Sequence, residues 1–291
     1  MSKAFRILVF FTGLVFSKSL FAISTVYEVS KGKSKLYLAG TIHLLRSQDF
    51  PPPAEFDGAY QQSQKIYFET DMEKAKSPEF GQRFAQAMIL PNNTTLKDIL
   101  SPENWSALQA YAEKSQYPLS QTMMFNPAMV SILITLNESK KLGVGEGADA
   151  YYDKAARADN KIIGELESLD DVLLYMKKFG QEEPNKIIAS TLEDVTNMPA
   201  DLEKMINSWK QGDLSGLDKM FSEKMRKETP AVYQSLIVER NQKWLPTIEA
   251  MLKTPETEMV MVGSLHLSGD DGLLAQLKKA GYKIKPYQLE K

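Results

Sequence analysis

The chain contains the pentad Gly40-Thr41-Ile42-His43-Leu44 near its start and a near-identical pentad, Gly263-Ser264-Leu265-His266-Leu267, near its end. Each pentad follows a short apolar run with the composition of a β-strand, residues 35–39 and 258–262. The two pentads hold both histidines of the protein. Because one frame closes two strands, we predict that two halves of the chain converge on a single site that contains both imidazoles.

Strand-like segments occur at both chain ends and once in the middle. They cover residues 24–30, 34–39, 65–71, 161–167, 258–262 and 283–289, and the first two flank a short turn typical of a hairpin. A helical period dominates the rest, with breaks expected near Pro184, Pro199, Gly212 and Pro230. The predicted fold class is α/β (α+β): a central mixed β-sheet built from both ends and a middle segment, with large helical insertions at about 72–142 and 170–253.

The N-terminus has the pattern of a secretory signal peptide. Lys3 and Arg6 precede an apolar run over residues 7–16, and small residues lead to Ala22, where we place the cleavage. Residues 1–22 are thus predicted to be a signal peptide and residues 23–291 a single domain, located in the periplasm or secreted. An uncleaved anchor and a buried first strand are the alternatives, although the apolar run is shorter than the ~20 residues of a membrane span.

The composition limits the class of partner and of chemistry. Of the 291 residues, 43% are hydrophobic and 25% charged, as in an ordinary globular protein, and the formal net charge is −2. Cleavage after Ala22 would remove three basic residues, and an acidic mature chain argues against nucleic acid or a membrane surface as a partner. The absence of cysteine excludes disulfides and a cysteine nucleophile, so any metal must have nitrogen and oxygen ligands. The composition leaves the oligomeric state open.

Carboxylates follow two of the predicted strands. Alternation along residues 65–71 puts Glu69 and Asp71 on one face, and alternation along residues 161–167 aligns Glu165 with Glu167. Ligands of α/β sheets gather at the carboxyl ends of the strands, so these acids are expected near the two histidines. An acid or histidine at a strand end is commonly a cap or a solvated residue, and the repeated histidine frame carries most of the argument.

Two imidazoles with one or two carboxylates can bind a divalent metal ion such as Mn, Co, Zn or Fe. The candidate metal ligands are His43, His266 and Glu69, with Asp71 and Asp149 as further candidates. A metal lowers the pKa of bound water, and a neighbouring carboxylate accepts the proton. Asp71, Asp149, Glu165 and Glu167 compete for the role of that base and for hydrogen bonds to the ligands.

Arg240 is a candidate catalytic residue together with Glu69 and Glu167. It lies on a predicted helix just before the second histidine strand, and its guanidinium could orient and stabilise a substrate oxygen. The alternative is a charged surface of that helix. Neither a G-x-S-x-G elbow, a P-loop, a G-x-G-x-x-G run nor an H-E-x-x-H helix is present.

The sequence resembles the TraB/PrgY/GumN family, which belongs to a superfamily that includes the Tiki proteases. Beside the two pentads, the resemblance rests on Phe68-Glu69-Thr70-Asp71, on residues 164–168, on the R-N-x-x-W motif of residues 240–244, and on residues 262–274. It covers nearly the whole mature chain. Two departures are the loop of residues 145–149, where the family usually has G-V-D, and Asn126-Pro127-Ala128 in place of K-P-W.

The resemblance implies a metal-dependent, peptidase-like hydrolase with His43, Glu69 and His266 at the site and Arg240 as the arginine of the family. From the residues and the resemblance together we expect an exported hydrolase that cleaves a peptide or related amide or ester bond, with a peptide or small molecule as substrate and a divalent metal ion as cofactor. The alternative is a periplasmic binding protein for haem, a metal or a peptide that performs no turnover.

Overall fold

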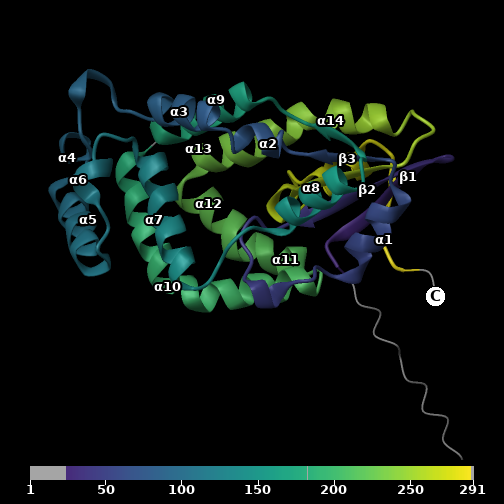
Figure 1. Ribbon diagram of the computed structural model, residues 1–291, viewed down its shortest axis with the longest axis horizontal. Coiled ribbons are helices and arrows are strands. Elements are labelled where there is room, and N and C mark those ends of the chain that lie inside the picture. Colours follow the sequence, from purple (N-terminus) through teal and green to yellow (C-terminus); the bar gives the residue numbers. More distant parts are fainter. Residues whose placement is uncertain (1–23, 182, 290–291) are drawn as a thin grey trace, which may run out of the picture.

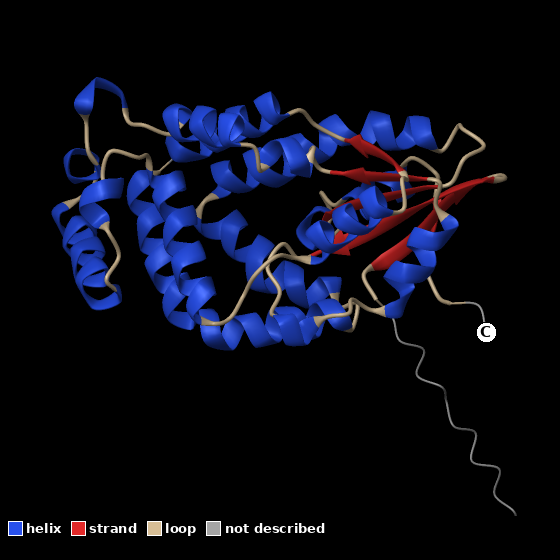
Figure 2. Ribbon diagram, viewed as in Figure 1, coloured by secondary structure: helices blue, strands red, loops and turns tan. Residues whose placement is uncertain are grey.

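The structure is a computed structural model that describes residues 24–181 and 183–289. The predicted signal peptide, residues 1–22, lies outside the described residues. The strands are β1 (Val26–Lys31), β2 (Ser34–Thr41), β3 (Lys65–Phe68), β4 (Ile162–Glu165), β5 (Glu258–Gly263) and β6 (Lys283–Pro286). They form one sheet in the order β4-β3-β5-β2-β1-β6, at one end of the elongated molecule (Figure 2).

Helices fill the rest of the chain (Figure 1). The first half contains α1 (Ala54–Gln62), α2 (Met72–Ala75), α3 (Pro78–Ala87), α4 (Leu96–Ile99), α5 (Pro102–Ser115), α6 (Leu119–Thr122), α7 (Pro127–Lys141) and α8 (Ala148–Ala158). The second half contains α9 (Leu169–Gln181), α10 (Pro184–Lys210), α11 (Leu214–Leu217), α12 (Glu223–Glu228), α13 (Pro230–Tyr233), α14 (Glu239–Met251) and α15 (Leu273–Lys279). Short 3-10 turns are η1 (Ser47–Asp49), η2 (Pro91–Asn93) and η5 (Ser264–His266), and two π-helical segments are η3 (Asp218–Ser222) and η4 (Gln234–Val238).

The sheet is mixed, as the sequence predicts. Strands β2, β5, β3 and β4 pair in parallel, whereas β1 pairs antiparallel with both β2 and β6. The hairpin of β1 and β2 needs only a short turn, but each parallel neighbour is reached through helices. The four parallel strands therefore end at the same edge, and the two pentads lie side by side there, with Gly40 opposite Val262 and Thr41 opposite Gly263.

The central strands are buried on both faces. In β5, Met259 and Met261 join one apolar core with α1, α8 and the end of α10, whereas Val260 and Val262 join another with α14 and α15. This alternation places helices on both faces of the sheet. Alternate side chains of β5 thus anchor the strand between the two helical layers.

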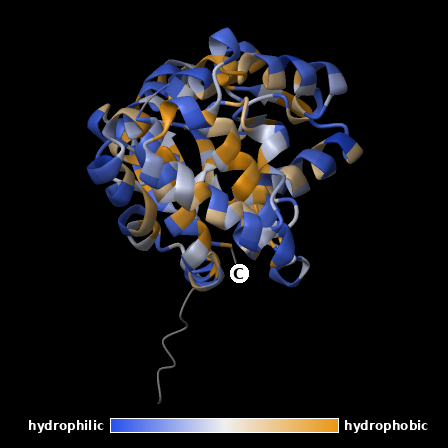
Figure 3. Ribbon diagram, turned by 90° about the vertical axis from the view of Figure 1, so that its left-hand side faces the viewer, coloured by the Kyte–Doolittle hydropathy of each residue, from blue (hydrophilic) through white to orange (hydrophobic). Residues whose placement is uncertain are grey.

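A third apolar core lies away from the sheet. It joins α4, α5, α7 and the beginning of α10 through Leu96, Leu108, Val130, Ile134 and Ile188. These helices form the end of the molecule opposite the strands (Figure 1). Viewed from that end, the hydrophobic residues gather toward the middle and the hydrophilic ones on the outer ribbons (Figure 3). Among the described residues, no helix has the length and apolar character needed to cross a membrane.

Three local predictions from the sequence are wrong. The helix break predicted near Pro199 is absent, and α10 continues through this residue. Apolar residues on both sides, among them Ile188 and Ile206, are buried in two different cores, and this packing offsets the backbone hydrogen bond that proline cannot make. The strands predicted over 65–71 and 161–167 end early, at Phe68 and Glu165, so strand alternation does not apply to the acids that follow.

Candidate active site

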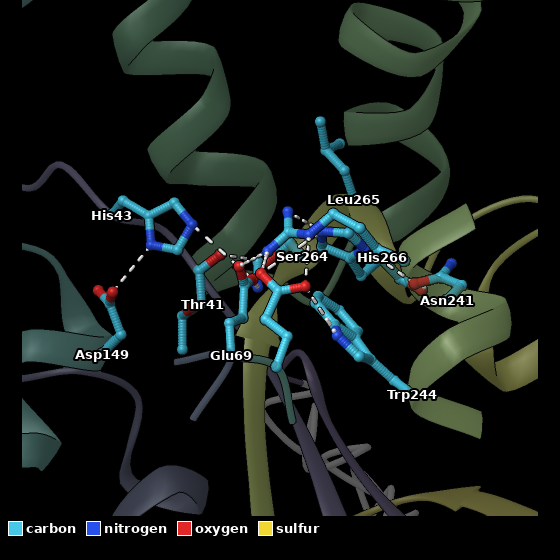
Figure 4. Close-up of polar contacts among 12 residues, drawn as sticks. Thr41, His43, Glu69, Asp149, Asn241, Trp244, Ser264, Leu265 and His266 are labelled. Carbon is cyan, nitrogen blue, oxygen red and sulfur yellow. Dashed lines mark hydrogen bonds and ion pairs between the residues drawn. The ribbon is translucent and has the colours of Figure 1, made fainter. Parts of the chain in front are cut away.

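The candidate site lies at the carboxyl ends of the four parallel strands (Figure 4). His43 comes two residues after β2, His266 ends the η5 turn after β5, and Glu69 directly follows β3. Glu167 comes two residues after β4. Because β4, β3, β5 and β2 are neighbours in the sheet, residues far apart in the chain meet at one edge. The two pentads meet at one site, as their shared sequence frame predicts.

His43 stands at the open side of the site, with 57% of its side chain exposed. Its Nδ1 lies 2.8 Å from Oδ2 of Asp149, and because a carboxylate can only accept, Nδ1 donates in this hydrogen bond. Nε2 then faces Glu69, at 3.9 Å from Oε1. Desolvation lowers the pKa of His43, but Asp149 and Glu69 outweigh it and raise that pKa to about 9. His43 is therefore an imidazolium at neutral pH.

A close backbone contact brings Asp149 to His43. Gly147 precedes α8, and its Cα lies so near the first pentad that a Cβ there would clash with the carbonyl oxygen of Ile42. The amide of Ala148 donates to the same carbonyl at 3.0 Å. Asp149, in the first turn of α8, is thereby held beside His43. The altered loop of residues 145–149 thus still supplies an aspartate to the site.

His266 is buried and has a different partner. Nδ2 of Asn241 donates to the carbonyls of His266 and Asp271, so Oδ1 of Asn241 is free to accept from Nδ1 of His266, at 2.8 Å. This leaves Nε2 without a proton, and it accepts from Nη1 of Arg240 at 3.2 Å. Burial is the main cause that lowers the pKa of His266, to about 3. The ring is therefore neutral, and it lies against the indole of Trp244, with ring centroids 4.5 Å apart.

Glu69 lies between the two imidazoles. Its Oε1 is 3.9 Å from Nε2 of each histidine and accepts a hydrogen bond of 2.7 Å from the amide of Gly263. Its Oε2 accepts from Nη2 of Arg240 at 2.6 Å. Burial raises the pKa of Glu69, but Arg240, together with the other contacts, more than offsets this and holds the pKa well below its usual range. Glu69 is therefore ionised.

Arg240 and Glu167 form the buried floor of the site. Nη2 and Nε of Arg240 donate to the two oxygens of Glu167, at 2.6 and 3.1 Å, and Nε1 of Trp244 donates to the same carboxylate at 3.0 Å. Burial raises the pKa of Glu167 against the pull of Arg240. The guanidinium also lies over the ring of Trp244, 4.6 Å from its centroid. Arg240 is thus a cation shared by Glu69, Glu167 and His266.

The side chains as arranged do not form a cage for a metal ion. Both oxygens of Glu69 accept hydrogen bonds from N–H donors, and Nε2 of His266 accepts one from Arg240. Among residues 24–181 and 183–289, no group of three or more histidine, aspartate or glutamate side chains is placed to hold a metal. A divalent ion would have to displace the guanidinium of Arg240, which already supplies the positive charge between Glu69 and His266.

Two carboxylates named from the sequence lie elsewhere. Oδ1 of Asp71 caps α2 by accepting from the amides of Glu73 and Lys74, and the carboxylate pairs with the ammonium group of Lys74. The prediction that Asp71 shares a face with Glu69 is therefore wrong, because the strand ends at Phe68 and the chain turns into a helix. Glu165 is exposed, whereas Glu167 is buried, so the predicted alignment of this pair is wrong as well.

Other residues of the site have roles that the sequence did not assign. Asn241 fixes the tautomer of His266, and Trp244 supports both that ring and Glu167. In the R-N-x-x-W motif, Trp244 follows Arg240 by four residues and Asn241 by three, so it neighbours both on the helix, and this spacing could have indicated a joint role. No comparable spacing singles out Thr41, whose buried hydroxyl lies beside the site.

A small pocket of about 190 Å³ adjoins His43 and Glu69. Its lining includes Thr41, Thr70 and Asp149. The hydroxyls of both threonines and Oδ1 of Asp149 are buried and have no hydrogen-bond partner within the described part of the chain. Buried polar atoms are normally paired with protein, water or a ligand. This pocket is therefore a place for water or for a polar part of a substrate.

A family of known proteins matches most of the chain. The model of the TraB/PrgY/gumN family matches residues 25–286. Neither the curated proteins nor the solved structures contain a significant match. The matched range includes both pentads, Glu69, Glu167, Asp149 and Arg240.

Proposed function

The chain belongs to the TraB/PrgY/gumN family, and from this premise and the geometry of the site we propose that the protein is a hydrolase that cleaves a peptide or related amide or ester bond. The observation that carries the proposal is the meeting of the two histidines of the pentads with Glu69, Asp149 and Arg240 at one edge of the sheet. Groups with oppositely shifted pKa values gathered in a pocket are typical of active sites.

The charges suit attack of water on a carbonyl carbon. The imidazolium of His43 and the guanidinium of Arg240 stand on either side of Glu69, and both can donate to an oxygen that gains negative charge. A substrate oxygen that accepts a hydrogen bond from Arg240 would draw the guanidinium away from Glu69. The pKa of Glu69 would then rise, and its carboxylate would accept the proton of the attacking water. Nε2 of His43 would in turn donate a proton to the leaving group.

Metal dependence stays a prediction of the residue types and of the family resemblance, and the proposed proton transfers do not require it. The test is to purify the mature protein, measure its metal content, and follow cleavage of a peptide mixture with and without chelator. Cleavage that chelator abolishes and added Mn, Co, Zn or Fe restores would support the metal, and Arg240 must then move. Cleavage that persists in a metal-free preparation would support a mechanism in which His43 and Arg240 supply the positive charge.

Matched variants decide whether the site is responsible. His43→Ala and Glu69→Gln should reduce kcat/KM by roughly a hundredfold or more, since each removes a group of the proton transfers. Glu165→Gln changes an exposed carboxylate at the end of the neighbouring strand β4 and should leave cleavage unaltered. If wild type cleaves no peptide, amide or ester, or if the three variants cleave alike, the hydrolase proposal fails.

Binding without turnover is a second candidate, because both oxygens of Glu69 and Nε2 of His266 are already hydrogen-bonded. A protein of this kind would take up a peptide, haem or a metal and release it unchanged. Stoichiometric uptake in calorimetry or in the haem absorption spectrum, with no cleavage product by mass spectrometry, would favour it. Export to the periplasm is likewise proposed, and the N-terminal residue of the mature protein, expected just after Ala22, is its test.

A further inference from the structure

A second pocket, of about 440 Å³, adjoins the small pocket and shares Thr41 and His43 with it. Arg240 and His266 are among the residues that line it. Most of the other lining residues are apolar, and we call the apolar wall the part formed by Met176, Met205, Phe221, Met225, Leu236 and Ile237. Its volume lies within the ~300–1,000 Å³ that is usual for ligand pockets.

The apolar wall is partly exposed. Met176, Met205, Phe221 and Leu236 are each only partly buried, although Met205 and Phe221 pack against the core beneath the sheet. Apolar side chains that remain open in a hollow beside charged groups are typical of a binding site rather than of a packed interior. Methionine is flexible and polarisable, so such a wall adapts to apolar groups of different shape.

Both π-helical segments contribute to this wall. η3 supplies Phe221, and η4 supplies Leu236 and Ile237. π-helical turns are rare, occur mostly as single turns and are frequent at functional sites, because the extra residue redirects the side chains of that turn. The meeting of two such turns at one pocket is a second observation, independent of the apolar lining, that points to a ligand.

The position of the charges orients the ligand. The bond to be cleaved belongs beside His43, Glu69 and Arg240, so an adjoining group of the substrate extends along the apolar wall. We propose that this pocket accommodates large apolar side chains of a peptide next to the cleaved bond, and that Phe221 and Leu236 determine the preference. The proposal makes two claims. The preference in cleavage rests on the proposed hydrolytic function, whereas the preference in binding, its binding half, does not.

The binding half is tested with His43→Ala, which retains the apolar wall, and two short peptides of equal length and charge. One peptide has Leu-Phe at its centre and the other Ser-Asn. We expect calorimetry to show about tenfold or tighter binding of the Leu-Phe peptide, with a negative heat-capacity change, because apolar surface leaves water. Equal affinity for both peptides would overturn the proposal.

The role of η4 in the apolar wall is tested by Leu236→Ser and by the milder Leu236→Met. Leu236→Ser should reduce the affinity for the Leu-Phe peptide at least about fivefold, whereas Leu236→Met should preserve it. Leu174→Ser is the matched control, since this leucine on α9 is 63% exposed and does not line the pocket. An equal loss in Leu174→Ser and Leu236→Ser, or a loss in neither, would contradict the assignment.

Cleavage by wild type separates this proposal from the function itself. Binding of the Leu-Phe peptide without cleavage of any peptide would end the hydrolase proposal and leave the apolar pocket standing. Cleavage of the Leu-Phe and Ser-Asn peptides with the same kcat/KM would support the hydrolase and overturn the pocket.

Discussion

The two histidines show how far one sequence frame can diverge in chemistry. Asp149 faces Nδ1 of His43, and the pKa of His43 rises to about 9; Asn241 faces Nδ1 of His266 in a buried place, and the pKa of His266 falls to about 3. A carboxylate stabilises the protonated ring, but an amide oxygen in a desolvated place does not. One imidazole is thus an acid and the other a neutral acceptor.

The Asp149→Asn variant tests the cause of the raised pKa of His43. Loss of the carboxylate should lower this pKa by about 1–3 units, and the alkaline limb of the kcat/KM profile should move down with it. Since the chain has only two histidines, NMR titration of the rings gives a readout that does not depend on activity. The pKa of His266 serves as the control and should stay in place. An unchanged titration of His43 would refute the assignment.

Glu167→Gln tests the buried ion pair with Arg240. The substitution leaves the cation with less compensation in a desolvated place, so we expect a loss of about 3–5 kcal/mol in the free energy of unfolding. Glu223 pairs with Lys227 at the exposed surface, where solvent screens the charges, so Glu223→Gln should cost far less than Glu167→Gln. Urea unfolding of both variants measures the two losses, and similar values would contradict a structural role for Glu167.

At the scale of elements, the loop before α8 joins the helical part of the chain to the first pentad. Gly147→Ala would push a methyl group into the backbone of Ile42 and His43, so we expect a lower melting temperature and a His43 pKa closer to its ordinary value. Gly145→Ala has open space and should change stability by less than about 0.5 kcal/mol. Thermal unfolding and NMR of the two variants provide the check. Equal behaviour of the two alanine variants would show that the close contact is not required.

Helix α10 illustrates why sequence periodicity failed at Pro199. Proline in a helix interior costs about 3 kcal/mol or more when judged locally. The helix reaches from the third core, through Ile188, to the core beneath the sheet, through Ile206 and Trp209. Packing at both ends holds the two halves in line, and no local pattern contains that information.

At the scale of the whole molecule, buried His266 makes the fold sensitive to acid. Its pKa is about 3 in the folded protein and near 6.5 when unfolded, so the unfolded chain binds the proton more readily. Stability from this residue is complete above pH 6.5 and falls by roughly 1 kcal/mol per pH unit as the pH drops toward 3. The free energy of unfolding of wild type should therefore decline more steeply over this range than that of His266→Gln. Parallel curves would rule out this source of acid sensitivity.

The sequence by itself determined the family, the mixed sheet and the convergence of both pentads with Glu69, because strand composition and the repeated histidine frame are local properties. The partners of each side chain were decided only by the tertiary structure. Asp71 left the site because the chain turned into α2 before that residue, whereas Asp149 entered it through the contact at Gly147. The protonation of His43 and His266 followed from these partners and from burial, and both depend on residues brought together from distant parts of the chain.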